Sequence, residues 1–296
     1  MSATTVTLSD GHSMPMVGFG TYLCSDEEAQ RVVSLALRAG YRHVDTAEYY
    51  ANEKGVGDGI RESGIPRAAV YVTTKLAPGG FGTPFKGYDE TMESFDRSNE
   101  RLGLGYVDLY LLHHAFAREE RLYQWRALVD LQKAGKVRSI GVSNWNIKHI
   151  EEIKAAGLPL PAVNQIEVHP LSTQSELVAY LKQHGIMPVA YSSLAPLPQW
   201  RADTPEKGAT KDDTAAADAT INGIATRLEV SAAQVLLRWG VQRGLPVLPK
   251  STNEARIRAN FDVFSFELSE DDMRSLDGLN QGKCFAWPTG DPLLCE

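Results

Sequence analysis

Short apolar segments alternate along the chain with longer segments of helical periodicity. The short segments are rich in Val, Ile and Leu, and a glycine often separates one from the helical segment before it. A strand, a helix, a glycine and a further strand in this order are typical of a parallel βαβ unit. The alternation therefore predicts an α/β fold whose parallel sheet is covered by helices.

Eight segments have the strand pattern, and five longer ones have a clear helical pattern. The predicted strands are 17–21, 41–45, 70–75, 107–112, 137–142, 162–167, 186–191 and 246–249, and the predicted helices are 26–39, 89–104, 121–134, 147–156 and 173–184. Eight strands alternating with helices favour a (β/α)8 TIM barrel over a doubly wound sheet. Residues 18–23 also lack the third glycine of a dinucleotide-binding fingerprint. Residues 6–17 precede the repeats and predict a short N-terminal β-hairpin that turns at Asp10 and Gly11.

Two stretches depart from this alternation within a single predicted domain that spans residues 1–296. Residues 196–220 are polar and rich in Ala, Asp and Thr, which predicts a long loop, either a lid or a disordered segment. Residues 279–296 have no helical period and are expected to form a C-terminal tail that wraps the surface.

Four polar side chains lie at the ends of three neighbouring predicted strands. Asp45 ends one strand and Tyr50 follows five positions later, Lys75 ends the next, and His113 follows the third. Singly, each residue has a structural interpretation: a helix cap, a helix-start aromatic, a solvated lysine or a core histidine. In a barrel, however, these ends converge at the C-terminal mouth, where active sites form.

The four groups make chemical sense as a proton-handling set. A phenol has an ordinary pKa of about 10, and a nearby ammonium is expected to lower it. A carboxylate would keep that ammonium charged and in place. Tyr50 could then protonate a carbonyl oxygen, with His113 as an orienting hydrogen-bonding group. The remaining histidines, His43, His149, His169 and His184, lack metal-ligand spacing, so no metal site is expected.

The other strand ends offer groups that suit a nucleotide. Ser143, Asn144 and Gln165 can each form a hydrogen bond with an amide, and Tyr191 offers a flat aromatic ring. Cations and hydroxyls gather around a predicted helix N-terminus at Lys250, Ser251, Thr252 and Arg256. That second group fits a phosphate, although an ordinary helix start with solvated cations explains it equally well.

Composition narrows the class of protein. With 43% hydrophobic and 23% charged residues, the chain can bury a full core. Its net charge of −7 argues against nucleic-acid partners and anionic membranes. Three scattered cysteines suit a reducing compartment, and we expect a cytoplasmic protein because no leader peptide or membrane span is evident.

Taken together, these motifs resemble those of the aldo-keto reductase family over essentially the whole chain. The strings that carry the resemblance lie at 18–21, 43–50, 72–76, 107–113, 141–144, 164–167, 190–192, 248–251 and 256–264. The resemblance implies an NADPH/NADP+-dependent enzyme of the aldose reductase-like, alcohol dehydrogenase (NADP+) kind, and we expect it to be a monomer. Such an enzyme reduces aldehydes or ketones by hydride transfer from C4 of the nicotinamide.

The resemblance also implies a role for each site residue. The catalytic tetrad would be Asp45, Tyr50, Lys75 and His113, with Tyr50 as the general acid. Cofactor-binding residues would be Gly20, Thr21, Tyr22, Asp45, Ser143, Asn144, Gln165, Tyr191, Ser192, Leu194, Lys250, Ser251, Thr252, Arg256 and Asn260, the last five at the adenosine end. Substrate would contact Tyr22, Tyr49, Phe81, His113, His114, Phe116 and Trp287.

The chain departs from the family pattern at a few positions. Ala259 replaces a frequent glutamate, which predicts weaker adenine contacts, and His114 replaces a frequent tryptophan. The loop at 115–120 is short, which suggests an open pocket. The alternative function is a non-catalytic, regulatory NADP(H)-binding protein of the same fold; the intact tetrad argues against it.

Overall fold

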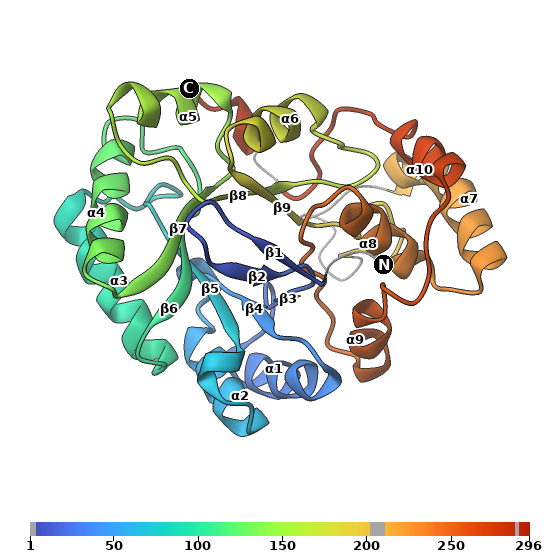
Figure 1. The fold of residues 1–296 in the computed structure, drawn as a ribbon, viewed down its shortest axis with the longest axis horizontal. Coiled ribbons are helices and arrows are strands. Elements are labelled where there is room, and N and C mark those ends of the chain that lie inside the picture. Colours follow the sequence, from blue (N-terminus) through green and yellow to red (C-terminus); the bar gives the residue numbers. More distant parts are fainter. Residues whose placement is uncertain (1–3, 202–210, 288–289) are drawn as a thin grey trace.

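In the computed structural model a curled parallel sheet lies at the centre of a ring of helices (Figure 1). The structure describes residues 4–201, 211–287 and 290–296. The strands are β1 (Thr5–Thr7), β2 (Ser13–Pro15), β3 (Phe19–Gly20), β4 (His43–Asp45), β5 (Tyr71–Leu76), β6 (Val107–Leu112), β7 (Val137–Ser143), β8 (Val163–Glu167) and β9 (Met187–Tyr191). The α-helices are α1 (Asp26–Ala39), α2 (Glu53–Ser63), α3 (Tyr88–Leu102), α4 (Arg121–Lys133), α5 (Ile147–Ala155), α6 (Ser175–Gln183), α7 (Lys211–Leu228), α8 (Ala232–Gln242), α9 (Glu254–Phe261) and α10 (Glu270–Asp277).

The sheet closes into the predicted barrel through one residue. Strands β3 to β9 pair in chain order, and every pairing is parallel. Val247 then bridges to Val17 on one side and to Ala190 on the other. The predicted eighth strand at 246–249 is therefore only a bridge. Pro246 and Pro249 lack the backbone N–H groups that a longer ladder requires.

The predicted hairpin is present and covers one end of the barrel. Strands β1 and β2 are antiparallel, and Gly11 turns the chain with a φ of 87°. In Figure 1 the hairpin crosses the centre of the ring. Its Met14 is fully buried and packs with inward-facing Leu109, Val163 and Leu248. The inner core is thus small and apolar, and the opposite end is left for the site.

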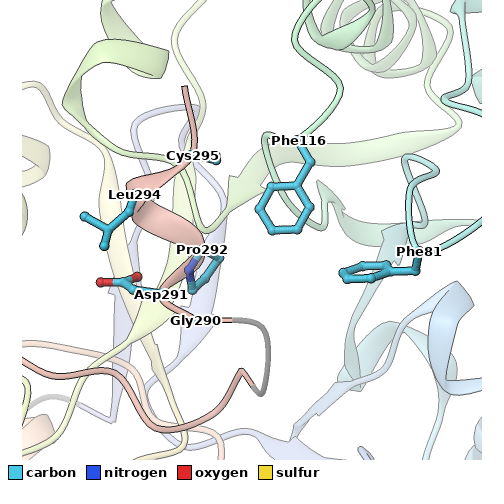
Figure 2. A pocket seen from close by; sticks show the side chains of 7 residues that line it. All are labelled: Phe81, Phe116, Gly290, Asp291, Pro292, Leu294 and Cys295. Carbon is cyan, nitrogen blue, oxygen red and sulfur yellow. The ribbon is translucent and has the colours of Figure 1, made fainter.

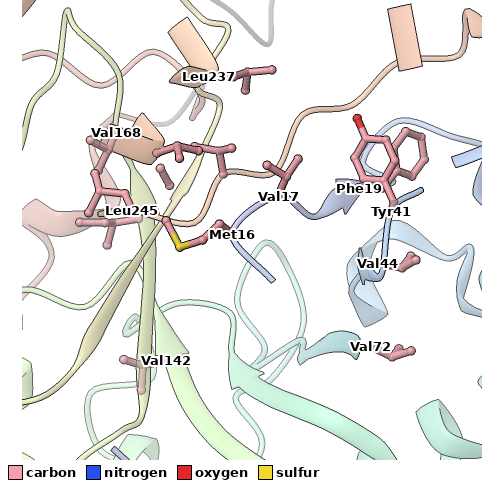
Figure 3. Packing of buried hydrophobic residues seen from close by; sticks show 14 of the residues in the cluster. Met16, Val17, Phe19, Tyr41, Val44, Val72, Val142, Val168, Leu237 and Leu245 are labelled. Atoms are coloured by element: carbon pink, nitrogen blue, oxygen red, sulfur yellow. The ribbon is translucent and has the colours of Figure 1, made fainter. Parts of the chain in front are cut away.

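A larger apolar core fills the space between the strands and the helices (Figure 3). Outward-facing residues such as Val44, Val72 and Val142 meet the helices there. Helix α1 shows how the sequence sets the boundaries: the Ser25 side chain caps its first turn, and Gly40 ends it with a φ of 119°. The predicted helix boundaries elsewhere hold to within two residues.

Helix α2 was not predicted because three glycines lower its helical propensity. Close packing explains them. A Cβ on Gly55 would lie 1.9 Å from the Asp26 carbonyl oxygen, and one on Gly57 would lie 1.9 Å from that of Leu102. The glycines let α2 pack closely against α1 and α3 where other side chains would collide.

The loop predicted at 196–220 is shorter than expected, because helix α7 begins at Lys211. Its sequence includes three consecutive alanines, which are strong helix formers, and Ala217 is fully buried. Residues 202–210 lie outside the described part of the chain. Within the described part, no helix combines the length and hydropathy needed to cross a membrane.

The glycine packing predicts opposite effects for two alanine substitutions. Gly57→Ala should lower the free energy of unfolding by about 2 kcal/mol or more, because its methyl group meets the Leu102 carbonyl oxygen. Gly223→Ala, on the exposed side of α7 with no atom near the new methyl group, should raise it by about 0.5–1 kcal/mol. Urea unfolding measures the free energy of unfolding of both variants. Equal changes in that free energy relative to the wild type would contradict the packing explanation.

Candidate active site

A buried ion pair lies where β4 and β5 end. The Lys75 Nζ donates to Asp45 Oδ1 at 2.6 Å and to the Thr46 carbonyl oxygen at 2.9 Å. Gln165 Nε2, from β8 across the barrel, donates to Asp45 Oδ2 at 2.8 Å. The lysine is 0% exposed. Adjacent parallel strands bring the two charges together, and the extra hydrogen bonds offset part of the cost of burying them.

Tyr50 and His113 lie against this pair, as the strand ends predict. Tyr50 belongs to the 3₁₀ turn Glu48–Tyr50 that follows β4, and its ring centroid is 5.1 Å from Lys75 Nζ. His113 follows β6, and its ring centroid is 5.6 Å from that of Tyr50. The structure therefore brings all four predicted residues together at one end of the barrel.

The pKa of Tyr50 differs from the sequence-based expectation. Burial, helped by the Asp45 charge, raises it well above its usual value, and the opposing cation is Arg201 rather than Lys75. Lys75 directs its ammonium at Asp45 and Thr46 instead. The pKa of Lys75 is itself lowered by burial, against the pull of Asp45. Tyr50 is therefore a protonated phenol at neutral pH.

His113 is a neutral imidazole. Burial lowers its pKa well below the usual value, and the charge of Lys75 lowers it further. A neutral imidazole carries one N–H, so His113 can donate a hydrogen bond without adding a second positive charge beside Lys75. Tyr50 and His113 together offer two neutral hydrogen-bond donors at the mouth.

The predicted amide-binding residues form one hydrogen-bonded chain. Ser143 Oγ donates to the Gln165 carbonyl oxygen at 2.8 Å, and Asn144 Nδ2 donates to that of His113 at 2.9 Å. Tyr191 Oη donates to Asn144 Oδ1 at 2.7 Å, and Trp287 Nε1 donates to Tyr191 Oη at 2.8 Å. Together with the Gln165–Asp45 bond, this network links the ends of β7, β8 and β9 to the ion pair.

The turn after β3 and the turn after β9 flank the site. Thr21 Oγ1 donates to the Asp45 carbonyl oxygen at 3.0 Å, and the Tyr22 ring lies 5.0 Å from the Tyr50 ring. Gly20 holds this turn through a 3.0 Å bond to the Pro249 carbonyl oxygen. Ser192, with a φ of 52°, and Leu194 are partly buried in the turn that follows β9.

The predicted phosphate-binding residues lie at the start of α9. Arg256 is exposed and its Nε donates to Ser251 Oγ at 3.3 Å, while the Thr252 carbonyl oxygen accepts a bond from Arg31. Asn260 is buried one turn further along the helix. Neither Lys250 nor Arg256 forms a salt bridge within the described part of the chain. Two cations beside hydroxyls and a helix N-terminus fit a phosphate group.

The predicted substrate residues form an aromatic cluster. His114 stacks on Phe116 at 4.2 Å, and Phe81 contacts Tyr49, Phe116 and Trp287 with centroid separations of 5.9–6.2 Å. A cavity of about 440 Å³ lies between Phe81, Phe116 and the C-terminal segment at 290–295 (Figure 2). At 57% exposed, Phe81 leaves a large part of its surface open to a ligand.

Sequence reasoning missed several residues at this mouth. The Arg201 guanidinium lies 5.0 Å from the Tyr22 ring centroid and donates to the Ala286 carbonyl oxygen. Asp291 and Cys295 line the cavity. Glu167, the last residue of β8, accepts hydrogen bonds from the backbone N–H groups of Phe285 and Ala286. Only Glu167 had a sequence signal, as a carboxylate at a strand end.

Comparisons with known proteins find relatives over nearly the whole chain. The family model described as the Aldo/keto reductase family matches residues 16–281. A Trypanosoma cruzi 9,11-endoperoxide prostaglandin H2 reductase is 42% identical over 97% of this chain and 94% of its own length. A Bacillus subtilis glyoxal reductase is 41% identical over 98% and 97% of the two chains.

Solved structures show the same fold. An aldo/keto reductase from Brucella melitensis superposes with a TM-score of 0.83 at 40% identity, covering 94% of this chain and 100% of that one. A Bombyx mori aldo-keto reductase in complex with NADP gives a TM-score of 0.84 at 33% identity, covering 96% and 95%.

The buried histidines predict a pH dependence of stability. Burial lowers the pKa of His114 to about 4, below its unfolded value of about 6.5. The unfolded state therefore binds more protons between these values, so the stabilisation is complete above pH 6.5 and is lost as the pH falls towards 4. The loss should be roughly 3 kcal/mol for this one group.

His114→Phe keeps the aromatic packing but removes the titration, so its free energy of unfolding should fall less steeply with acid than that of the wild type. Urea unfolding at several pH values between 7 and 4 measures both slopes. Identical slopes would show that His114 does not titrate between the two states.

Proposed function

The chain belongs to the aldo/keto reductase family, and on that premise we propose that it is an NADPH-dependent reductase of aldehydes or ketones. We place it with the aldose reductase-like enzymes, as a monomer of the cytoplasm. The observation that carries the proposal is the buried Asp45–Lys75 pair with the Tyr50 and His113 rings against it. A hydrolytic nucleophile is not required by this chemistry.

Tyr50 acts as the general acid. Its raised pKa keeps the phenol protonated, so it has a proton to give when a carbonyl oxygen gains electron density. His113, as a neutral N–H donor, orients that oxygen and stabilises its developing charge. Arg201 opposes the rise in the Tyr50 pKa and so favours the phenolate that proton transfer leaves behind. Lys75, fixed by Asp45, assists as a second cation with its Nζ 5.1 Å from the Tyr50 ring centroid.

The cofactor-binding residues divide into two groups along the mouth. Ser143, Asn144 and Gln165 would hold the carboxamide, with Tyr191 against the nicotinamide ring, while Lys250, Ser251 and Arg256 would hold the 2′-phosphate. For the phosphate group, the support is that Lys250 and Arg256 form no salt bridge with another described residue and that Arg256 lies beside Ser251. For the carboxamide group, it is the network of amide side chains joined to the ion pair. When bound, NADPH supplies the hydride that reduces the carbonyl carbon.

The pocket walls favour substrates with aromatic or apolar groups. Tyr49, Phe81, His114, Phe116 and Trp287 surround the approach to Tyr50 and His113. The two named relatives reduce glyoxal and a prostaglandin endoperoxide. We therefore propose dicarbonyls and long apolar carbonyl compounds as the first substrate classes to test.

The direct test is the absorbance of NADPH with purified protein and a panel of glyoxal, aromatic aldehydes and ketones. The proposal expects oxidation of NADPH that depends on the carbonyl compound. Tight NADPH binding without turnover across the panel would favour a regulatory nucleotide-binding protein instead.

Removing the phenol hydroxyl should stop proton transfer and spare binding. We expect Tyr50→Phe to lower kcat by about 10²–10⁴-fold, a typical contribution of general acid catalysis, with little change in the Kd of NADPH. Steady-state kinetics and fluorescence titration measure the two quantities. A variant with wild-type kcat would show that Tyr50 is not the acid.

Removing the cation at the start of α9 should discriminate between cofactors. Arg256→Ala should weaken NADPH by about 10–100-fold, the effect of a lost charged hydrogen bond, and weaken NADH much less. Arg258→Ala is the matched control, because that arginine pairs with Glu254 on the same helix. Equal losses for NADPH and NADH would mean that Arg256 does not contact the 2′-phosphate.

A further inference from the structure

We propose that Glu167 is a positioning residue that holds residues 285–287 over the substrate pocket and so sets the KM for bulky carbonyl substrates. This inference rests on the proposed reductase function. Glu167 ends β8 and is 1% exposed. It lies two residues after Gln165, which binds Asp45, so the same strand supports both the ion pair and the C-terminal segment.

The Glu167 carboxylate binds two successive backbone N–H groups. Phe285 N donates to Oε1 at 2.6 Å, and Ala286 N donates to Oε2 at 2.9 Å. Hydrogen bonds to a charged acceptor are about twice as strong as neutral ones, and a buried site strengthens them further. The carboxylate therefore fixes the backbone of the C-terminal segment at one point.

A histidine also holds the carboxylate. His169 Nε2 lies 3.0 Å from Glu167 Oε1, and the His169 ring is 5.5 Å from the Phe285 ring. His169 is 0% exposed and its own backbone is closed in a turn with Ser172. Glu167 thus has little freedom to move, and the segment that it binds shares this constraint.

The segment depends on such contacts because it has no regular structure of its own. Residues 279–287 form neither a helix nor a strand. Their backbone is also held at two other points, by a 2.9 Å bond from Gln281 N to the Leu171 carbonyl oxygen and by a 2.8 Å bond from Arg201 to the Ala286 carbonyl oxygen. Loss of the Glu167 contact would remove the hydrogen bonds to the N–H groups of Phe285 and Ala286, the two residues directly before Trp287.

The position of the segment determines a wall of the pocket. Trp287 follows Ala286 directly, donates to Tyr191 Oη, and has its ring 6.2 Å from Phe81 and 5.9 Å from Phe116. The Ala286 carbonyl oxygen also accepts a 2.8 Å bond from Arg201. Glu167 therefore acts on substrate through Trp287, without touching the reacting atoms.

The experiment compares Glu167→Gln with the wild type. The glutamine side chain has nearly the same volume as that of Glu167, but its N–H₂ group replaces one of the two acceptor oxygens. One of the two backbone N–H groups, of Phe285 or Ala286, therefore loses its acceptor. Hydrogen exchange of the Phe285 and Ala286 amides should accelerate about tenfold or more, the effect of losing one such bond. The KM of a bulky aromatic aldehyde should rise about tenfold, while kcat, the Kd of NADPH and the KM of glyoxal stay near wild-type values.

Two controls make the comparison specific. Glu270→Gln removes the same charge from a 94% exposed side chain and should leave every value unchanged. Trp287→Ala should raise the KM of the aromatic aldehyde, and adding Glu167→Gln to it should raise that KM no further, because Glu167 acts through Trp287. If Glu167→Gln does not fold, Glu167→Asp, which withdraws the carboxylate by one methylene, takes its place.

Unchanged hydrogen exchange at the Phe285 and Ala286 amides would overturn the proposal. An additive rise in the KM of the aromatic aldehyde in the double variant would also overturn it. So would a loss of NADPH affinity large enough to account for the rise in that KM. Failure of the proposed function is distinguishable. A protein without carbonyl-dependent turnover would still show the exchange effect if Glu167 holds the segment.

Discussion

The arrangement of the candidate active site depends on one buried ion pair, between Asp45 and Lys75. A charge pair of this kind costs free energy to bury, and removal of one partner typically costs about 3–5 kcal/mol. Parallel strands bring the two charges into contact, because β4 and β5 lie side by side. Gln165 adds a hydrogen bond to the same carboxylate from β8. A hydrophobic pair would stabilise the barrel as well, so the charges are best explained by chemistry at the mouth.

The mouth combines segments from distant parts of the chain. Tyr22 follows the first barrel strand, Arg201 precedes α7, and Trp287 lies near the C-terminus. Nevertheless the Tyr22 ring lies beside that of Tyr50, Arg201 lies over the Tyr22 ring, and Trp287 binds Tyr191. Hydrogen bonds hold part of this arrangement together: Trp287 donates to Tyr191, Tyr191 donates to Asn144, and Asn144 donates to the His113 carbonyl oxygen. Residues far apart in the sequence therefore form one continuous hydrogen-bonded rim at the mouth.

The sequence was sufficient to predict the barrel and the meeting of Asp45, Tyr50, Lys75 and His113, because parallel strands all end at the same mouth. It was insufficient wherever tertiary packing decides the outcome. The glycines of α2 weaken its helical pattern and are explained only by the neighbouring carbonyl oxygens. The pKa of Tyr50 rises because of burial, which no spacing reveals. Arg201 reaches the site through contacts with Tyr22 and Ala286 that have no sequence signature.

The most direct test of the account follows a labelled hydride. Purified protein would be given an aldehyde and NADPH carrying deuterium at C4 on either face, and the alcohol would be analysed by mass spectrometry and NMR. The account predicts deuterium on the carbinol carbon from one of the two labelled cofactors. An alcohol that contains no deuterium from either, or takes it only from solvent, would contradict direct hydride transfer at this site.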